Sequence, residues 1–293
     1  MIKVLIVLAV AVVLLVACKG KSGVNDVISG GPGIGIDTAT INKVEREASR
    51  LKVKTDTISF SKQEGVFQVS LFADYPVEGG HHVVFAVRDF INQFFGGTYV
   101  GQLSYGREVV NQNGEQLFSE FKETCSNVDL DDVNELFLYK RVNMSYESPT
   151  FVTFMASLSE YSGGIHGMGT VTGHTFSKFT GKPFSYDMMK NLDTPAFKRL
   201  IKEGLRTFFS KEGDEQGISD EDLLNELVSY SGSIDDLPLP DSEPYMTEQG
   251  ITFIYQPYEI SYFAAGMPQL TIPYDVAKPY LTDQAVEDFL VAH

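Results

Sequence analysis

The chain has 293 residues, of which 43% are hydrophobic and 12% aromatic, with 21 phenylalanines, 14 tyrosines and no tryptophan. This composition excludes a disordered or fibrous chain, and the length suits one large domain or two small ones. The 23 basic and 39 acidic residues give a formal net charge of −16. That balance argues against nucleic acid as a partner and favours a cation or a basic protein.

The amino terminus reads as a lipoprotein signal. Lys3 precedes an apolar run, Val4–Ala17, that is too short for a membrane-spanning helix. The run ends in Leu15-Val16-Ala17-Cys18, which resembles a bacterial lipobox, where the cysteine sulfur receives a diacylglycerol before cleavage. We therefore expect residues 1–17 to be a signal peptide and Cys18 to be the lipidation site. The alternative is an ordinary secretory signal with a coincidental cysteine.

An acylated Cys18 would hold the protein on a membrane, because each buried methylene of an acyl chain contributes about 0.8 kcal/mol. The predicted location is the bacterial cell envelope, and Lys19 after the cysteine favours the outer membrane, on its periplasmic or surface face. Residues 18–37 contain many glycines and are expected to form a flexible tether spanning roughly 25 Å. Cys125 then lacks an intramolecular partner and suits the role of a small buried hydrophobe.

Residues 38–130 predict an amino-terminal α+β subdomain. Alternating apolar residues indicate strands, and apolar residues at helical spacing followed by Gly96-Gly97 indicate a helix that ends there. The expected elements are an edge strand over 41–60 paired with a strand over 66–73, a break at 74–80, a helix over 83–94, and two short helices over 105–110 and 115–125. The alternative for part of the edge strand is a helix over Lys43–Leu51.

Residues 131–293 predict a second α+β domain, so the fold class is α+β, with antiparallel sheet regions packed by helices in two related subdomains. The pattern begins with an antiparallel meander and becomes helical at Asp193-Thr194-Pro195, a helix-start signal. The expected elements are strands over 136–146, 151–158 and 167–179, helices over 195–208 and 220–229, a loop over 231–244, strands near 251–256 and 268–273 beside the 160–179 hairpin, and a helix over 284–290.

No residue pattern makes a positive case for an enzyme. His166 and His174 are eight residues apart, so on a regular strand they lie roughly 26 Å apart, too far to share a metal ion. The chain contains no G-x-S-x-G motif for a nucleophilic serine. We predict no cofactor and no metal.

Two blocks of sequence carry a resemblance to a known family. Tyr161-Ser162-Gly163-Gly164-Ile165-His166-Gly167, followed by Thr180-Gly181-Lys182, resembles the Y-x-G-G-x-H-G signature and T-G-K turn of the RsiV-like extracellular domain. The second block, Pro257-Tyr258-Glu259-Ile260 with Tyr262, Gly266 and Ile272-Pro273-Tyr274, is similar to that family's P-Y-E-I block. Ser261 stands where the family commonly has a second proline.

The resemblance implies an α+β fold, a place in the cell envelope and a binding role. It also implies that the two blocks lie near one another, which makes them a candidate contact surface. The candidate binding residues are Tyr161, Gly163, Gly164, His166, Gly167, Pro257, Tyr258, Glu259, Tyr262 and Gly266.

Two functions stay open. The first is a non-catalytic, membrane-anchored envelope lipoprotein that binds a peptidoglycan-like glycan or a basic protein such as lysozyme. The alternative is a cell-wall hydrolase or deacetylase that uses His166 as general acid and base, with Glu259 nearby. A carboxylate within hydrogen-bond reach of His166 in an open cleft would favour the enzyme.

Overall fold

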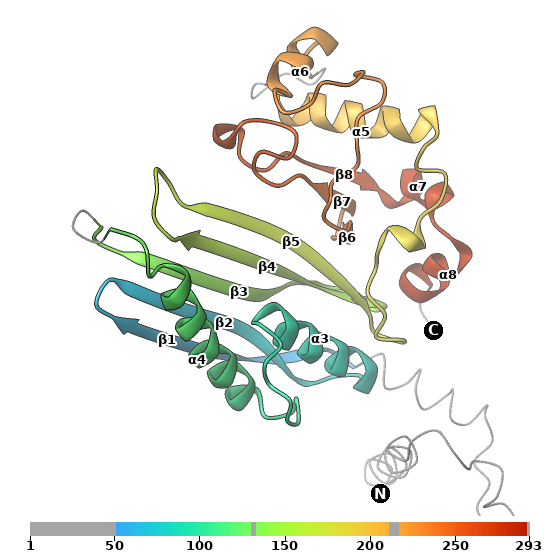
Figure 1. Ribbon diagram of the computed structural model, residues 1–293. Helices are drawn as coiled ribbons and strands as arrows, with labels where there is room; N and C mark the ends of the chain where they lie inside the picture. The colour runs from blue at the N-terminus through green and yellow to red at the C-terminus, as the bar shows by residue number, and fades with distance from the viewer. Residues whose placement is uncertain (1–50, 130–132, 211–216, 292–293) are drawn as a thin grey trace, which may run out of the picture. The chain divides into compact units, whose positions relative to one another are not determined.

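The computed structural model describes residues 51–129, 133–210 and 217–291. These contain a five-stranded sheet in the order β1-β2-β3-β4-β5 and a three-stranded sheet in the order β6-β7-β8 (Figure 1). The strands are β1 Lys54–Glu64, β2 Phe67–Glu78, β3 Leu136–Glu147, β4 Phe151–Tyr161, β5 Met168–Ser177, β6 Tyr245–Met246, β7 Gly250–Ile254 and β8 Gln269–Pro273. The helices are α3 His81–Phe94, α4 Gly106–Thr124, α5 Pro195–Phe208, α6 Asp220–Glu226, α7 Tyr274–Ala277 and α8 Asp283–Ala285, with short turns η1 Tyr186–Met188, η2 Phe263–Ala265, η3 Lys278–Tyr280 and the π-helical η4 Val286–Leu290.

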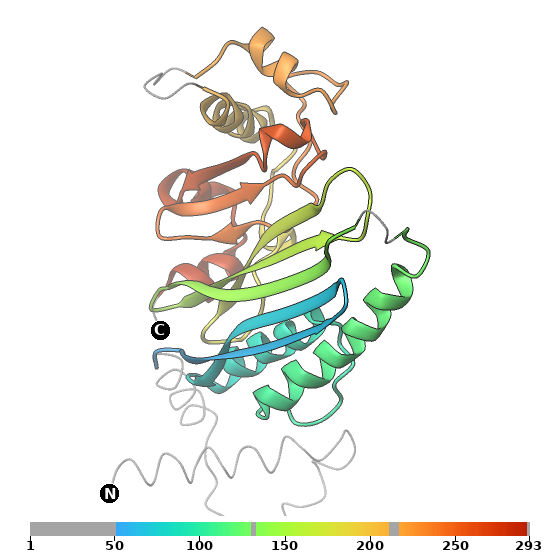
Figure 2. The same ribbon diagram turned by 90° about the vertical axis from the view of Figure 1, so that its left-hand side faces the viewer.

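The fold class is α+β, as predicted. Neighbouring strands of the large sheet pair antiparallel, except that β2 and β3 pair in parallel. A parallel pair needs a long crossover, and here it contains α3 and α4, which cover one face of the sheet (Figure 2). The predicted domain boundary at 130/131 lies between these two paired strands.

The first core lies between α3, α4 and the large sheet. Alternating β2 residues from Val69 to Tyr75 are buried against Val83, Val87 and Ile91 of α3. Cys125, at the end of α4, is buried in the same core, which matches its predicted role as a small hydrophobe.

The prediction of two short helices in place of α4 was wrong, because the turn-like residues at its centre have packing partners. Asn113 is fully buried and donates to the Asn92 side chain at 2.8 Å and to the Val109 carbonyl at 2.9 Å. A Cβ on Gly114 would lie 2.3 Å from the Phe60 ring. The glycine is therefore a contact point for β1 rather than a helix break.

The predicted strand break at 74–80 was also wrong, since β2 continues to Glu78. Beyond Ala73 this strand pairs only with β1, so Pro76 lies where no hydrogen bond to β3 is needed. Proline is tolerated at such edge positions.

The strands near 251–256 and 268–273 were expected beside the β4–β5 hairpin. They instead form a separate sheet with β6. This sheet meets the face of β4 and β5 opposite α3. The Thr153 hydroxyl donates to the Met246 carbonyl at 2.7 Å, and the Met246 N–H donates to the Thr175 hydroxyl at 2.8 Å. A Cβ on Gly173 would lie 2.1 Å from the Tyr245 ring, so only glycine admits this contact.

The second core lies between the small sheet, α5 and the carboxy-terminal helices. Helix α5 begins at Pro195, as predicted, and the Thr194 side chain caps it by accepting from the Phe197 N–H. Its buried stripe consists of Phe197, Ile201 and Leu205. Within the described ranges no helix is both long and apolar enough to cross a membrane.

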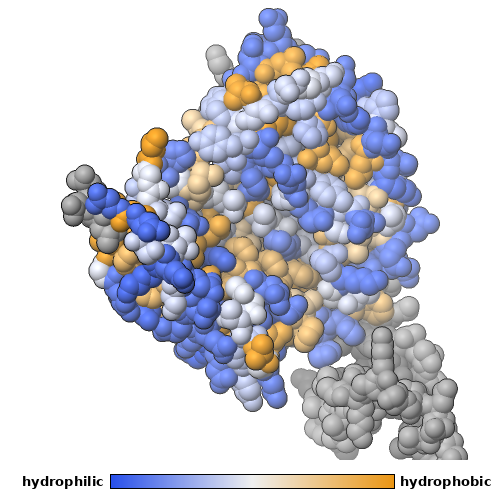
Figure 3. Space-filling model, viewed as in Figure 1, coloured by the Kyte–Doolittle hydropathy of each residue, from blue (hydrophilic) through white to orange (hydrophobic). Residues whose placement is uncertain are grey.

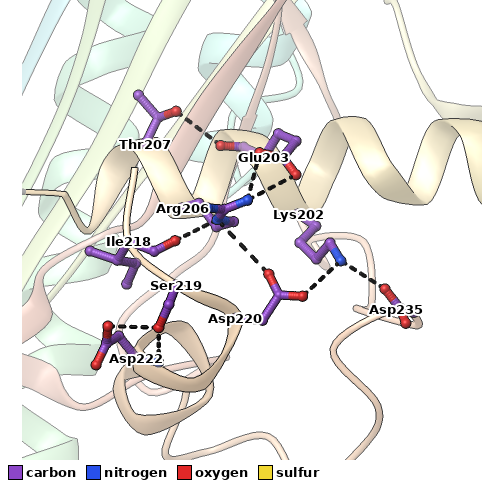
Figure 4. A network of polar contacts seen from close by, with 9 residues as sticks. All are labelled: Lys202, Glu203, Arg206, Thr207, Ile218, Ser219, Asp220, Asp222 and Asp235. Carbon is purple, nitrogen blue, oxygen red and sulfur yellow. Dashed lines mark hydrogen bonds and ion pairs between the residues drawn. The ribbon is translucent and has the colours of Figure 1, made fainter. Parts of the chain in front are cut away.

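Ion pairs connect α5 to α6 and to the following loop (Figure 4). Lys202 lies 3.1 Å from Asp220 and 2.8 Å from Asp235, and Arg206 also points toward Asp220. The side chain of Lys202 is only 14% exposed. This network fixes α6 and the 231–244 loop on the outer face of α5.

Candidate functional site

The turn between β4 and β5 and the loop over 257–266 lie side by side (Figures 1 and 2). The hydroxyl of Tyr258 lies 3.2 Å from Nε2 of His166, and the His166 ring stacks on Phe263 with centroids 4.6 Å apart. The two blocks that carry the family resemblance are therefore adjacent, as the resemblance implied.

Three rings make up what we call the aromatic surface: His166, Tyr258 and Phe263. Their centroids are 4.6, 5.6 and 6.4 Å apart, and their planes differ by 25–30°. His166 is exposed, and Tyr258 and Phe263 are 47% and 37% exposed. The rings thus form a nearly parallel, solvent-facing set.

Hydrogen bonds fix the orientation of the His166 ring. Nδ1 lies 2.9 Å from the Gly167 carbonyl, which can only accept, so Nδ1 carries a proton. In the neutral ring Nε2 is then the acceptor, and the Tyr258 hydroxyl donates to it. One histidine thus links the turn to the loop.

Glycine geometry shapes the turn itself. Gly163 and Gly164 have φ of +101° and +105°, values that favour glycine over other residues. Tyr161 donates from its hydroxyl to the Gly164 carbonyl at 2.9 Å, and a Cβ on Gly167 would lie 2.8 Å from the Glu160 carbonyl. These three glycines therefore set the path that presents His166.

Side chains also hold the 257–266 loop. Gln256 accepts from the Val171 N–H at 3.1 Å and donates to the Val171 carbonyl at 2.9 Å. The Glu259 carboxylate accepts from the backbone N–H groups of Gln256 and Asp241 at 2.6 and 2.7 Å. Burial raises the pKa of Glu259, although these two N–H groups act in the opposite direction. Glu259 is thus a structural anchor for the loop.

The loop backbone is unusual at Tyr258, whose φ is +67°. Such a conformation costs of order 1–3 kcal/mol for a non-glycine residue and needs support from its surroundings. Pro257, next to it, is half-buried. The strained residue is one of the three members of the aromatic surface.

Tyr262 and Gly266 lie farther along this loop. Tyr262 is 40% exposed and donates from its hydroxyl to the Glu226 carboxylate at 2.7 Å, which raises its pKa. Gly266 is exposed and follows η2. These two predicted residues lie outside the three-ring set.

Phe263 was not among the site residues predicted from the sequence. Phe263 is the ring closest to His166. The exposed apolar side chains of Ile165 and Met168 flank the same turn, and Ile165 is fully exposed. The available signal was an aromatic residue directly after the Y-x-x-x-Y spacing of Tyr258 and Tyr262.

The polar atoms of His166 and Glu259 are engaged by neighbouring groups. Both ring nitrogens of His166 have hydrogen-bond partners, and both oxygens of Glu259 bind backbone N–H groups. Among the described residues, no carboxylate bonds to His166, and no group of three histidine, cysteine or acidic side chains is placed to hold a metal ion. Cys18, the predicted signal peptide and the predicted tether lie outside the described residues.

Comparison with known proteins shows that residues 187–275 match the family described as "Protein of unknown function (DUF3298)", so the chain contains a DUF3298 domain. The fold is similar to that of a DUF3298 family member from Bacteroides fragilis NCTC 9343, at 18% identity and a TM-score of 0.60, over 83% of this chain and 100% of that one. It is also similar to a DUF3298 family protein from Pseudomonas aeruginosa PAO1, at 14% identity and a TM-score of 0.52, over 80% of this chain and 97% of that one. At these identities the likeness establishes the fold alone. Curated proteins give no match.

Proposed function

We propose that this protein is a non-catalytic, RsiV-like lipoprotein of the bacterial cell envelope that binds a peptidoglycan-like glycan through its aromatic surface. The observation that carries the proposal is the convergence of His166, Tyr258 and Phe263 from two distant segments into one exposed set of rings. Flat aromatic faces provide apolar contact area, and the polar tips of tyrosine and histidine supply hydrogen bonds at its border.

Anchoring at the outer membrane through acylated Cys18 is the second part of the proposal. It rests on the lipobox-like Leu15-Val16-Ala17-Cys18 and on Lys19 after it. Mass spectrometry of the protein extracted from membranes tests it, with a diacylglycerol thioether expected on residue 18. An unmodified thiol there would overturn the anchor.

Glycan binding is tested with the chain from residue 18 onward, carrying Cys18→Ser so that it stays unacylated. Immobilised protein is exposed to muropeptides at low and high salt. We expect salt-insensitive capture that falls at least tenfold in Tyr258→Ala and Phe263→Ala. Tyr105→Ala is the matched control, because Tyr105 is 52% exposed and lies outside the aromatic surface.

A basic protein such as lysozyme is the second candidate ligand, favoured by the net charge of −16. Charge complementarity acts chiefly on the association rate and weakens with salt. Lysozyme capture that disappears at high salt, together with no muropeptide capture, would select this candidate over the glycan.

A further inference from the structure

A groove of about 650 Å³ lies between α3 and the end of β5, away from the aromatic surface. One face of α3 over 81–93 forms one wall, His174 and Phe176 of β5 form the floor, and the turn over 180–183 closes the end. Figure 3 shows hydrophobic surface between α3 and β5, bordered by hydrophilic residues. Ligand sites in proteins commonly have volumes of 300–1,000 Å³ and mostly apolar walls.

The floor of the groove is aromatic. The Phe90 ring lies 4.2 Å from the His174 ring and 5.7 Å from the Phe176 ring, centroid to centroid. At the rim Phe85 is 57% exposed. The fold leaves the Phe85 side chain exposed, and the apolar body of a ligand would cover it.

His174 provides a polar group within this apolar floor. Its Nε2 lies 2.8 Å from the Thr172 hydroxyl, and Nδ1 makes no hydrogen bond to any described residue. Burial lowers the pKa of His174 to about 4, so the ring is neutral at pH 7. With the Thr172 hydroxyl donating to Nε2, Nδ1 carries the proton and can donate to a ligand acceptor.

The polar part of the lining combines three histidines with one lysine and one aspartate. His81, His82 and His174 line the groove together with Lys182 and Asp89, and burial lowers the pKa of His81 as it does that of His174. Lys182 is exposed and pairs with no carboxylate of the described residues. The Lys182 ammonium can therefore pair with an anionic group on the ligand.

The end wall of the groove is fixed before any ligand arrives. Gly181 has φ of +72°, and a Cβ there would lie 2.6 Å from the His82 carbonyl, so the turn packs tightly on the start of α3. The Gly181 N–H also donates to the Ser177 carbonyl at 2.8 Å. A preformed wall lowers the ordering cost of binding.

We propose that this groove binds a small amphiphilic carboxylate, with its apolar body on Phe85 and Phe90 and its carboxylate near Lys182 and His174. The site is separate from the aromatic surface, so neither proposal depends on the other.

The test is a titration of the unacylated chain from residue 18, labelled with ¹⁵N at its histidine rings, with octanoate followed by NMR. We expect a saturable shift of the His174 nitrogens, with affinity at least tenfold higher for octanoate than for 1-octanol, which lacks the charge, or acetate, which lacks the apolar body. Lys182→Ala and Phe85→Ala should each weaken octanoate at least fivefold. Both residues are exposed, so both variants should fold.

Lys190→Ala is the control, since Lys190 is an exposed lysine outside the groove, and its octanoate affinity should be unchanged. Equal binding of octanoate and 1-octanol, or unchanged affinity in Lys182→Ala, would overturn the carboxylate assignment. The absence of any saturable His174 shift up to millimolar octanoate would overturn the site.

Discussion

The two faces of the β4–β5 hairpin are built differently. Toward α3, the hairpin presents apolar side chains such as Phe154 and Phe176, which pack into the first core. Toward the small sheet it presents Thr153, Gly173 and Thr175. The two threonines form hydrogen bonds with Met246 of β6, and the Tyr245 ring packs directly on the Gly173 backbone. Apolar packing tolerates adjustment, whereas directional bonds and close approach fix one position. Apolar packing therefore holds the helices on the large sheet, whereas a few hydrogen bonds and one close ring contact fix the position of the small sheet.

The largest effect is expected where the Tyr245 ring covers Gly173. In Gly173→Ala the new methyl would lie 2.1 Å from that ring, which forces the sheets apart, and we expect a loss of about 3 kcal/mol in the free energy of unfolding. Denaturant unfolding measures it. Gly169→Ala, on the same strand, is the control, because its nearest contact would be 3.4 Å from the Leu158 carbonyl. Equal losses in both variants would contradict a specific contact.

On the α3 side, the polar residue His174 should make stability depend on pH. Its pKa is lowered from 6.5 to about 4 by burial, so between these values only the unfolded chain binds the proton. Stability should therefore fall by about 3 kcal/mol as the pH falls from 6.5 to 4, with no further loss from this group below pH 4. Unfolding of His174→Gln across the same range should lack this component; identical pH profiles would contradict the prediction.

The hydroxyl pair between β4 and β5 should have the next largest effect. Thr153→Val removes the donor to the buried Met246 carbonyl, and we expect a loss of about 2 kcal/mol because that carbonyl stays desolvated. Thr57→Val, on the exposed edge of β1, should change stability by less than about 0.5 kcal/mol. A near-neutral Thr153→Val would mean that the oxygen finds water or another donor.

The smallest effect is expected in the ion network of α5, far from either face of the hairpin. Asp235→Asn removes one of the two carboxylates at Lys202, and because Asp235 is mostly exposed we expect Tm to fall by less than about 2 °C, and by less still at high salt. Asp56→Asn, at an exposed β1 position outside the described ion pairs, is the control. A larger fall that persists at high salt would contradict a screened surface pair.

The sequence predicted the elements whose local signals agree with their tertiary contacts. The meander of β3, β4 and β5, helix α3 and the capped start of α5 were predicted from periodicity and caps. It failed where a partner distant in the chain overrides the local signal. Gly114 indicates a helix break, but in the structure Phe60 packs on it within a continuous helix. Pro76 indicates the end of a strand, but β2 continues because beyond Ala73 it pairs only with β1. The separate small sheet depends on Thr153, Thr175 and Met246, which no local pattern connects.

The proximity of the two candidate loops was predicted through the resemblance rather than from periodicity. The stacking of His166 on Phe263 could not be predicted, because it depends on side-chain directions across about 90 residues of intervening chain. The anchoring role of Glu259 depends likewise on the direction of its side chain toward two backbone N–H groups. The groove beside His174 was not predicted, since its walls come from α3 and from a turn that follows β5.

The paired hydrogen bonds of Gln256 have a consequence for the edge of the large sheet. β5 is the last strand of the large sheet, and such strands offer unpaired backbone groups that can recruit another chain. The Gln256 amide occupies both the N–H and the carbonyl of Val171, as an added strand would. This side chain therefore satisfies both backbone groups of Val171, and its removal would leave them unpaired at the edge of the sheet.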